Sequence, residues 1–243
     1  GITGNNQEEI KRLLSLKTKD YSKIRINGEE VTSNNIKQHC KKIVIIDSNI
    51  NPVNYGKKNY DIMLQEIMNN GLVLKDYEKK IIDSLKIVGI KQSVLNKYFT
   101  ELSSSEQKLF KIAVSLLHNP EVIIIEEPFK GLDLKNEKRI SMVLQKMRDE
   151  YNKTIVFISE NSEELYRYTD YLIAIKNEKI IIEGKTTEVY QKVPLLNRNK
   201  ITVPEIVSIT YLAKKNKNIK LNYHKDVRDI IKDIYKHVWK GGI

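Results

Sequence analysis

Hydroxyl and carboxylate side chains gather in two stretches of this chain. The first is the serine-rich segment Leu102-Ser103-Ser104-Ser105-Glu106. The second is the β-branched run 122–125, which ends in the adjacent carboxylates Glu126 and Glu127 and is followed by Pro128 and by Gly131-Leu132-Asp133. An apolar run of this length predicts a buried strand. The spacing therefore predicts a serine-rich helix start, then a strand that presents two carboxylates, then a short acidic loop.

Each stretch also has an interpretation that needs no ligand. Ser103 followed three residues later by Glu106 matches a capping box, in which both side chains satisfy backbone N–H groups at a helix start. Two carboxylates after a strand can be a simple acidic pair at the strand exit. For the serine segment both interpretations stay open, whereas the Gly131 and Asp133 loop favours a functional interpretation of Glu126 and Glu127.

The order of these features resembles that of the ABC-type ATPases, whose signature motif, Walker B strand and D-loop follow one another in the same way. The resemblance implies an α/β P-loop NTPase fold with a mainly parallel sheet, a helical subdomain insertion and a small C-terminal helical extension. It places Glu126 at the Mg²⁺-organising position, Glu127 at the water-polarising position and Asp133 in the D-loop. In the signature motif the glycines and the glutamine of the family are replaced by Ser104, Ser105 and Glu106.

The segment that resembles a P-loop is residues 1–9. A P-loop wraps phosphates with backbone N–H groups, while a Lys reaches the phosphates and a Ser or Thr hydroxyl binds Mg²⁺. The positions that the resemblance assigns to nucleotide binding are Gly1, Gly4, Asn5, Asn6, Gln7 and Glu8, together with Ser103, Ser104, Ser105 and Asp133. Gln7 stands in place of the Lys, and Glu8 and Glu9 stand in place of the hydroxyls. Two unit charges 4 Å apart repel by roughly 4 kcal/mol at an effective dielectric of about 20, so these carboxylates oppose a polyphosphate.

Two further family positions also carry carboxylates. Asp47 follows the apolar run 42–46 and replaces the Gln of the Q-loop, where it either coordinates a metal or caps the next turn as a strand-end Asp. Glu160 follows the run 154–158 and replaces the switch His. An ionised carboxylate cannot donate a hydrogen bond to a γ-phosphate. The resemblance gives Glu126, Glu127, Asp47 and Glu160 as candidate catalytic positions, and the four histidines show no metal-ligand spacing.

Hydrophobic periodicity predicts an α/β chain with one helical insertion. Helical spacing at 8–16 and a strand before the turn Asn27-Gly28 precede the run 42–46, which reads as a strand buried on both faces. Residues 59–119 read as helices, and strands then alternate with helices up to a strand pair joined at Asn177. We expect an ABC ATPase-like domain at 1–192, with a helical subdomain at about 52–117, and a C-terminal helical extension at 193–243.

Composition limits the class of protein. The 243 residues are 40% hydrophobic and 30% charged, as in a folded protein of one or two domains. The absence of a long apolar run or a signal peptide, together with the single cysteine Cys40, predicts a reducing, cytoplasmic location. The net charge is +11, and the part of the chain from Lys185 onward contains 13 Lys and Arg residues but only 5 Asp and Glu residues. This excess is either a solvated surface or a face for anionic lipid or an acidic partner. No aromatic-interleaved basic tract appears, so no nucleic acid partner is expected.

The tail that starts at residues 201–207 resembles the C-terminal extension of the energy-coupling-factor importers. This resemblance implies a place on the cytoplasmic face of the membrane, a second ABC ATPase-like subunit in a homo- or heterodimer, and a membrane coupling protein. The tail carries apolar stripes for association or for packing on the parent domain: Ile206, Ile209, Leu212, Ile230, Ile231, Ile234 and Val238. A docking groove, or ordinary subdomain core, is expected from Tyr55, Tyr60, Ile62, Met63, Ile67 and Met68.

Two departures from the family pattern decide the functional expectation. The strands that normally precede the P-loop are not seen, and their loss would open a gap in the centre of the sheet. Either the chain has rebuilt that edge or further residues precede Gly1. The second departure is that most motif residues are replaced together. We therefore expect a degenerate subunit, a pseudo-ATPase inactive alone, with a structural or regulatory role and no cofactor unless the site still binds Mg-ATP. The alternatives are an active or half-active ATPase subunit of a heterodimer, and a basic scaffold or nucleic-acid-binding protein that reuses the fold.

Overall fold

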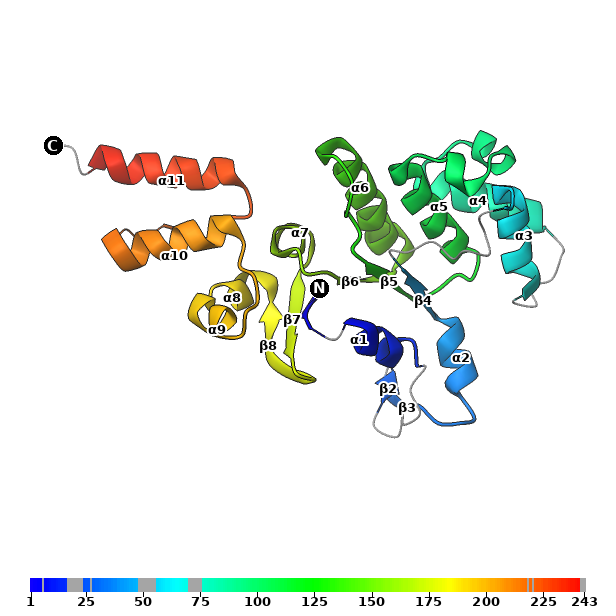
Figure 1. The fold of residues 1–243 in the computed structure, drawn as a ribbon, viewed down its shortest axis with the longest axis horizontal. Coiled ribbons are helices and arrows are strands. Elements are labelled where there is room, and N and C mark those ends of the chain that lie inside the picture. The colour runs from blue at the N-terminus through cyan, green and yellow to red at the C-terminus, as the bar shows by residue number, and fades with distance from the viewer. Residues whose placement is uncertain are drawn as a thin grey trace. The chain divides into compact units, whose positions relative to one another are not determined.

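The computed structural model describes residues 1–5, 7–16, 24–26, 28–47, 56–69, 76–217, 219 and 221–240. The chain divides into two compact units (Figure 1). One unit combines Gly1–Gln7 with Phe157–Ile243, and the other is the continuous stretch Glu8–Val156. The first unit is therefore assembled from the two ends of the sequence.

The continuous unit contains two pairs of strands. β4 (Ile43–Ile46) and β5 (Val122–Glu126) are parallel, with Ile43 opposite Val122 and Ile46 opposite Ile125. β2 (Arg25–Ile26) and β3 (Glu29–Glu30) form an antiparallel hairpin. The centre of β5 is buried as predicted, whereas three of the four β4 residues are partly exposed. The prediction that this run is buried on both faces was therefore wrong, because hydrophobicity alone does not say whether both faces of a strand are covered.

The helices of this unit include the insertion that the sequence predicts. α1 (Gln7–Leu14) and α2 (Ile36–Lys41) precede α3 (Asn59–Asn69), α4 (Tyr77–Val88), α5 (Ser104–Leu116) and α6 (Leu134–Tyr151), with short 3₁₀ turns at Gln92–Asn96 and Phe99–Glu101. Their apolar stripes meet in a core whose most buried members are Met63, Ile67, Leu85, Leu109, Phe110, Ile140 and Met147. Ordinary core packing, one of the two interpretations of these residues, therefore accounts for Met63 and Ile67. Tyr55 lies outside the described residues.

The discontinuous unit is built on β1 (Ile2–Gly4), the end of β6 (Thr154–Ile158), β7 (Tyr171–Lys176) and β8 (Lys179–Lys185). β1 pairs in parallel with β6 through Ile2 and Ile158, and with β7 through Ile2 and Ile173. β7 and β8 are antiparallel and are joined by Asn177 and Glu178, both with positive φ, as a two-residue type I′ hairpin requires.

The position of β1 agrees with one of the two alternatives, that of a rebuilt sheet. Residues 2–4 were assigned to a phosphate-binding loop, but they form a strand between β6 and β7. Ile2 and Thr3 are both buried. The chain therefore supplies its own strand at this place, and only residues 5 and 6 separate it from the first residue of α1.

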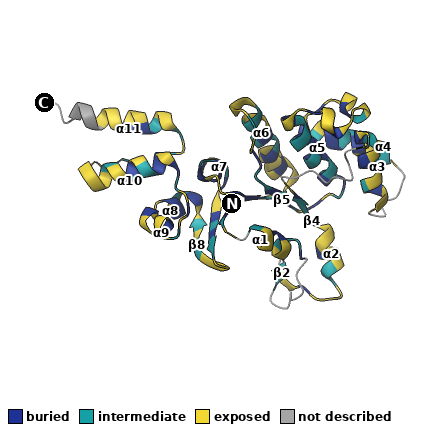
Figure 2. Cartoon of the chain, in the orientation of Figure 1, coloured by how far each residue is buried: buried dark blue, intermediate teal, exposed yellow. Residues whose placement is uncertain are grey.

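The remaining helices follow the strands of the same unit: α7 (Ser162–Tyr168), α8 (Thr186–Tyr190), α9 (Val193–Arg198), α10 (Glu205–Lys217) and α11 (Val227–Lys240). Much of the surface of α10 and α11 is exposed (Figure 2). The class of fold is as predicted, since β1–β6, β1–β7 and β4–β5 are parallel pairs and helices separate most strands. Within the described part of the chain, no helix has the length and apolar character needed to cross a membrane.

Candidate functional site

A buried lysine, Lys11, lies at the centre of the predicted site. Its ammonium Nζ lies 2.6 Å from Glu8 Oε1, 2.8 Å from Glu126 Oε1 and 3.3 Å from Asp47 Oδ1. Glu8 is in the first turn of α1, Glu126 ends β5 and Asp47 follows β4 directly. The structure therefore brings together three carboxylates that the sequence assigned to the P-loop, the Walker B strand and the Q-loop.

The Lys11 ammonium is stabilised by these partners. Burial alone lowers the pKa of Lys11, but the hydrogen bonds to Glu126 and Glu8, and the negative charges of Glu126 and Asp47, outweigh it and raise the pKa above its ordinary value. The side chain is only 9% exposed. Lys11 is therefore a fixed positive charge rather than a solvated surface lysine.

Sequence reasoning missed Lys11 because its two other partners are 36 and 115 residues away. A weak local signal existed. Lys11 is three residues after Glu8 on the same helix, a spacing at which side chains face one another. It also directly follows the buried Ile10, which places it near the covered side of α1.

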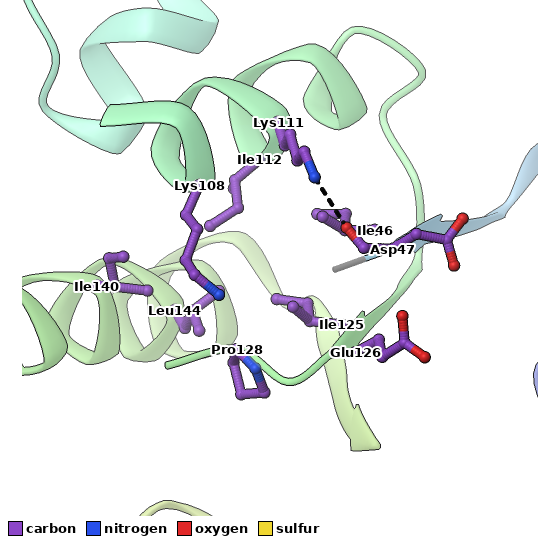
Figure 3. A pocket seen from close by; sticks show the side chains of 10 residues that line it. All are labelled: Ile46, Asp47, Lys108, Lys111, Ile112, Ile125, Glu126, Pro128, Ile140 and Leu144. Carbon is purple, nitrogen blue, oxygen red and sulfur yellow. Dashed lines mark hydrogen bonds between the residues drawn. The ribbon is translucent and has the colours of Figure 1, made fainter. Parts of the chain in front are cut away.

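Beside this cluster lies a small pocket between β4, β5, α5 and α6 (Figure 3). Its volume of about 20 Å³ is enough for one water molecule and is far below the size of a nucleotide site. Lys111 points to the backbone oxygen of Asp47 at 3.0 Å, while the carboxylates of Asp47 and Glu126 lie on the side away from Ile140 and Leu144. Burial lowers the pKa of Lys111, and the charges of Asp47 and Glu126 oppose that effect.

Glu127, the predicted water-polarising residue, has an unusual backbone. Its φ is +45°, a left-handed conformation that is costly for a residue with a Cβ atom. Its carbonyl oxygen accepts a hydrogen bond of 2.8 Å from Lys108 Nζ on α5. The residue is partly buried. The loop after β5 is thus held to α5 through the main chain of Glu127.

Gly1 and Gly4 are explained by packing within their own unit. A Cβ atom on Gly4 would lie 1.8 Å from the carbonyl oxygen of Ile175, and Gly4 has a φ of +125°. A Cβ atom on Gly1 would meet the Leu165 side chain at 2.8 Å. Asn5 exchanges two hydrogen bonds with Asn177, at 3.2 and 3.0 Å. These contacts hold β1 and its flanking residues to α7, to β7 and to the turn after β7. Asn6 lies outside the described residues.

The serine segment forms the capping box that was one of its two interpretations. The Ser103 hydroxyl accepts from the Glu106 N–H at 3.3 Å, and Glu106 accepts from the Ser103 N–H at 3.0 Å. The bond from the Ser103 N–H, and a second bond of 2.8 Å from the Ser103 hydroxyl to the same carboxylate, lower the pKa of Glu106. Ser104 is exposed, and Ser105 is buried within 3.4 Å of the Ser103 hydroxyl.

The other predicted positions lie at helix starts or in loops. Asp133 N-caps α6, because its carboxylate accepts from the Asn136 N–H at 2.8 Å. Gln7 begins α1. Glu160 follows β6 in the discontinuous unit, is exposed, and accepts at its backbone oxygen a 3.0 Å hydrogen bond from the Thr202 hydroxyl. The next turn that Asp47 was expected to cap begins outside the described residues.

The donor set of the carboxylate cluster does not fit Mg-ATP. Mg²⁺ requires oxygen ligands at about 2.0–2.1 Å in octahedral geometry, yet the oxygens of Glu8 and Glu126 face an ammonium group instead. No group of three or more His, Cys, Asp or Glu side chains among the described residues is arranged to hold a metal ion. The positions at which the resemblance expects a Lys and two hydroxyls carry Gln7, Glu8 and Glu9.

Comparison with known proteins identifies the family. A family model described as ABC transporter matches residues 10–130. The energy-coupling factor transporter ATP-binding protein EcfA2 of Caldanaerobacter subterraneus is 26% identical over 226 residues, which cover 88% of this chain and 76% of that protein. EcfA2 of Streptococcus pyogenes is 23% identical over 254 residues, which cover 98% of this chain and 86% of that protein.

Solved structures agree on the fold. CbiO1 from Clostridium perfringens, described as part of the ABC transporter complex cbiONQ, has a TM-score of 0.70 at 22% identity over 86% of both chains. A dimeric ATP-binding cassette bound to ADP and Pi has a TM-score of 0.60 at 19% identity, over 76% of this chain and 84% of the other. The match to the family model, together with these similarities, shows that residues 10–130 form an ABC transporter domain and that the chain has the P-loop ABC ATPase fold.

Proposed function

We propose that this chain is a degenerate ATP-binding subunit of an energy-coupling-factor type transporter, a pseudo-ATPase with a structural or regulatory role. The observation that carries the proposal is the Lys11 ammonium held by Glu8, Glu126 and Asp47. The groups that would organise Mg-ATP in a working subunit are engaged in an internal ionic cluster. The subunit then contributes its scaffold and its binding surfaces rather than hydrolysis.

The strand that replaces the loop supports the same proposal. A P-loop needs several consecutive backbone N–H groups that are free to surround phosphate oxygens. Here residues 2–4 pair with residues 173–175 in the β1–β7 ladder, and Gly4 is closely packed on Ile175. The glycines that resemble a P-loop are needed for strand packing, so they are no sign of phosphate binding.

The proposed partners are a second ABC ATPase-like subunit and a membrane coupling protein, with the chain peripheral on the cytoplasmic face. The names of the relatives and the dimeric solved cassette support this assignment. In the proposed extension 193–243, apolar side chains are exposed on both helices, among them Ile209, Leu212, Ile231 and Ile234. In the proposed helical subdomain at about 52–117, Met63 is buried, whereas Met68 is 61% exposed. Met68 is therefore the methionine of this subdomain that is accessible to a docking helix of a partner.

A second candidate function is that of a half-active subunit in a heterodimer. It is favoured by the start of α5, where Ser103 and Ser104 are exposed at the N-terminus of a 13-residue helix. A helix N-terminus attracts anions, so this end can still serve the nucleotide of a partner subunit. In that case the chain completes a site that it does not itself contain.

Calorimetric titration of the full chain with Mg-ATP tests the proposed function. We expect no binding heat at millimolar nucleotide, and no ATPase activity in Gln7→Lys, because Glu8 and Glu9 still repel the phosphates. Low-micromolar binding by the wild type, or hydrolysis by the variant, would overturn the pseudo-ATPase assignment. If instead a partner ATPase of the same complex loses activity with Ser104→Trp, the half-active function is favoured.

A further inference from the structure

In the ionic cluster around Lys11, three carboxylates surround one ammonium group. Loss of nucleotide binding alone does not require such an arrangement. Replacing motif residues removes ligands, but it does not supply a cation. Here one is supplied from inside the chain: the Lys11 ammonium contacts a carboxylate from α1, one after β4 and one at the end of β5. Three segments of one unit converge on a single charge.

The partners of Lys11 occupy the positions at which this fold handles its metal. In P-loop NTPases the Mg²⁺ ion is held by the hydroxyl residue of the P-loop and by the Walker B carboxylate. Those two positions are Glu8 and Glu126 here, and each gives an oxygen to the ammonium at 2.6 and 2.8 Å. A second cation bound to the same oxygens would stand beside the ammonium. Space and charge both oppose that arrangement.

We propose that the Lys11 ammonium acts as a tethered cation in place of a divalent metal, and that it holds the ends of β4 and β5 to α1 without metal or nucleotide. This inference deepens the proposed function and rests on it. The residue at the hydroxyl position agrees with this exchange of a metal ion for an ammonium group. It is the carboxylate Glu8, which is stabilised by a nearby positive charge. A working site would keep a hydroxyl there and leave the charge to the ion.

The neighbouring contacts agree with a site built around an ammonium. An ammonium donates three hydrogen bonds at about 2.7–2.9 Å to ionised oxygens. Lys11 has three carboxylate neighbours, and the two nearest are within or just below that range. Lys111 adds a second ammonium at the backbone oxygen of Asp47. The cluster is thus largely compensated before any ion arrives from solution.

The test is metal dependence in the absence of nucleotide. Thermal unfolding of the full chain is recorded in EDTA and in millimolar Mn²⁺, and binding of Mn²⁺ is followed by the electron paramagnetic resonance signal of the free ion. The wild type is expected to melt at one temperature in both solutions and to leave the Mn²⁺ signal unchanged. Lys11→Met is expected to melt about 6–12 °C lower in EDTA, because carboxylates lose their buried partner, and to recover stability as it binds Mn²⁺.

Two further variants make the result decisive. Lys42→Met removes an exposed ion pair with Glu121 in the same unit and should neither lose several degrees nor gain metal binding. Lys11→Met combined with Glu8→Gln leaves one carboxylate fewer, so it should fold more readily and still respond to Mn²⁺. The proposal is overturned if the wild type binds one Mn²⁺ that Glu126→Gln abolishes, if the Lys11 variants respond to metal no more than Lys42→Met, or if both Lys11 variants fail to fold even in Mn²⁺. Each result is independent of ATP binding by the wild type, which tests the proposed function separately.

Discussion

Gly4 illustrates how a single residue can resemble a functional motif for a structural reason. Its φ of +125° is outside the range that residues with a Cβ atom usually adopt, and the Ile175 carbonyl oxygen occupies the space where a Cβ atom would lie. Because the close atom belongs to the backbone of β7, it cannot rotate away. The residue type is dictated by the pairing of β1 with β7.

We predict that Gly4→Ala destabilises the chain by more than about 3 kcal/mol, through a backbone clash combined with an unfavourable φ. The matched control is Gly131→Ala, where φ is +76° but no atom lies within 4 Å of the added Cβ, and where the cost should be about 1 kcal/mol. Urea unfolding followed by circular dichroism measures both values. Similar stabilities for the two variants would contradict the close packing of β1 on β7.

At the same scale, sequence reasoning located the carboxylates but not their organisation. Glu126 and Asp47 were predicted to lie at strand ends, and both do. The role of Lys11 was not predicted, because a lysine on a short helix is ordinarily solvated. Its burial depends on partners that are distant in the sequence. Local spacing cannot reveal a charge cluster whose members are set by tertiary structure.

Among the elements, α5 shows the closest agreement between sequence and structure. A capping box is a local device, since all its hydrogen bonds join residues within one turn, and it was therefore visible in the sequence. Glu106 has a lowered pKa because its carboxylate accepts hydrogen bonds from the Ser103 backbone and hydroxyl. A carboxylate with a lowered folded-state pKa stabilises the fold above its unfolded pKa of about 4.3, and this contribution is lost as the pH falls through the folded value.

Glu106→Gln restores the family residue and should separate these effects. We expect a stability loss of at most about 1 kcal/mol at pH 7, because the amide still accepts a hydrogen bond but carries no charge at the helix N-terminus. Below pH 4.3 the difference from wild type should shrink, since the wild-type carboxylate also becomes neutral. Unfolding curves between pH 7 and 3 measure this, with the exposed Glu183→Gln on β8 as the control. A difference that stays constant over this range would contradict a charge effect.

Strand β1 shows where prediction from local sequence failed at the scale of elements. Three residues carry too little periodicity to identify a strand, and the glycines Gly1 and Gly4 suggest a loop. Its identity is set by β6 and β7, which surround it. The Asn177 hairpin, by contrast, was predicted because the residue types that favour turns can be recognised from the local sequence.

For the molecule as a whole, the helices of the tail bury only part of their apolar surface. Ile206 and Ile230 are 6% and 3% exposed, which agrees with packing on their own unit. Ile231 and Ile234 on α11 are 45% and 38% exposed, and Tyr235 is 62% exposed. Packing accounts for one part of each stripe and leaves the other part for the proposed association with a partner.

We predict that the full chain self-associates through α11, and that the double variant Ile231→Ser and Ile234→Ser shifts it toward the monomer with little change in melting temperature. Loss of apolar contact area across an interface weakens association, while residues already facing solvent contribute little to folding. Light scattering coupled to size-exclusion chromatography gives the mass. Lys214→Ser on α10 serves as the control, and a monomeric wild type would contradict homodimer formation through this surface.

The assembly of one unit from both ends of the chain has a consequence for the order of events during synthesis. Asn5 meets Asn177 across a separation of 172 residues, and Ile2 pairs with Ile158. At translation rates of about 5–20 residues per second, β1 waits roughly 10–30 s for the strands that receive it. Meanwhile the continuous unit is completed first. β1 can therefore pair only after β6 and β7 have been synthesised, and long-range closure of this kind is a slow step in folding. A nascent chain in which residues up to 156 have emerged should carry a protected unit at 8–156, while residues 1–7 remain open to proteases.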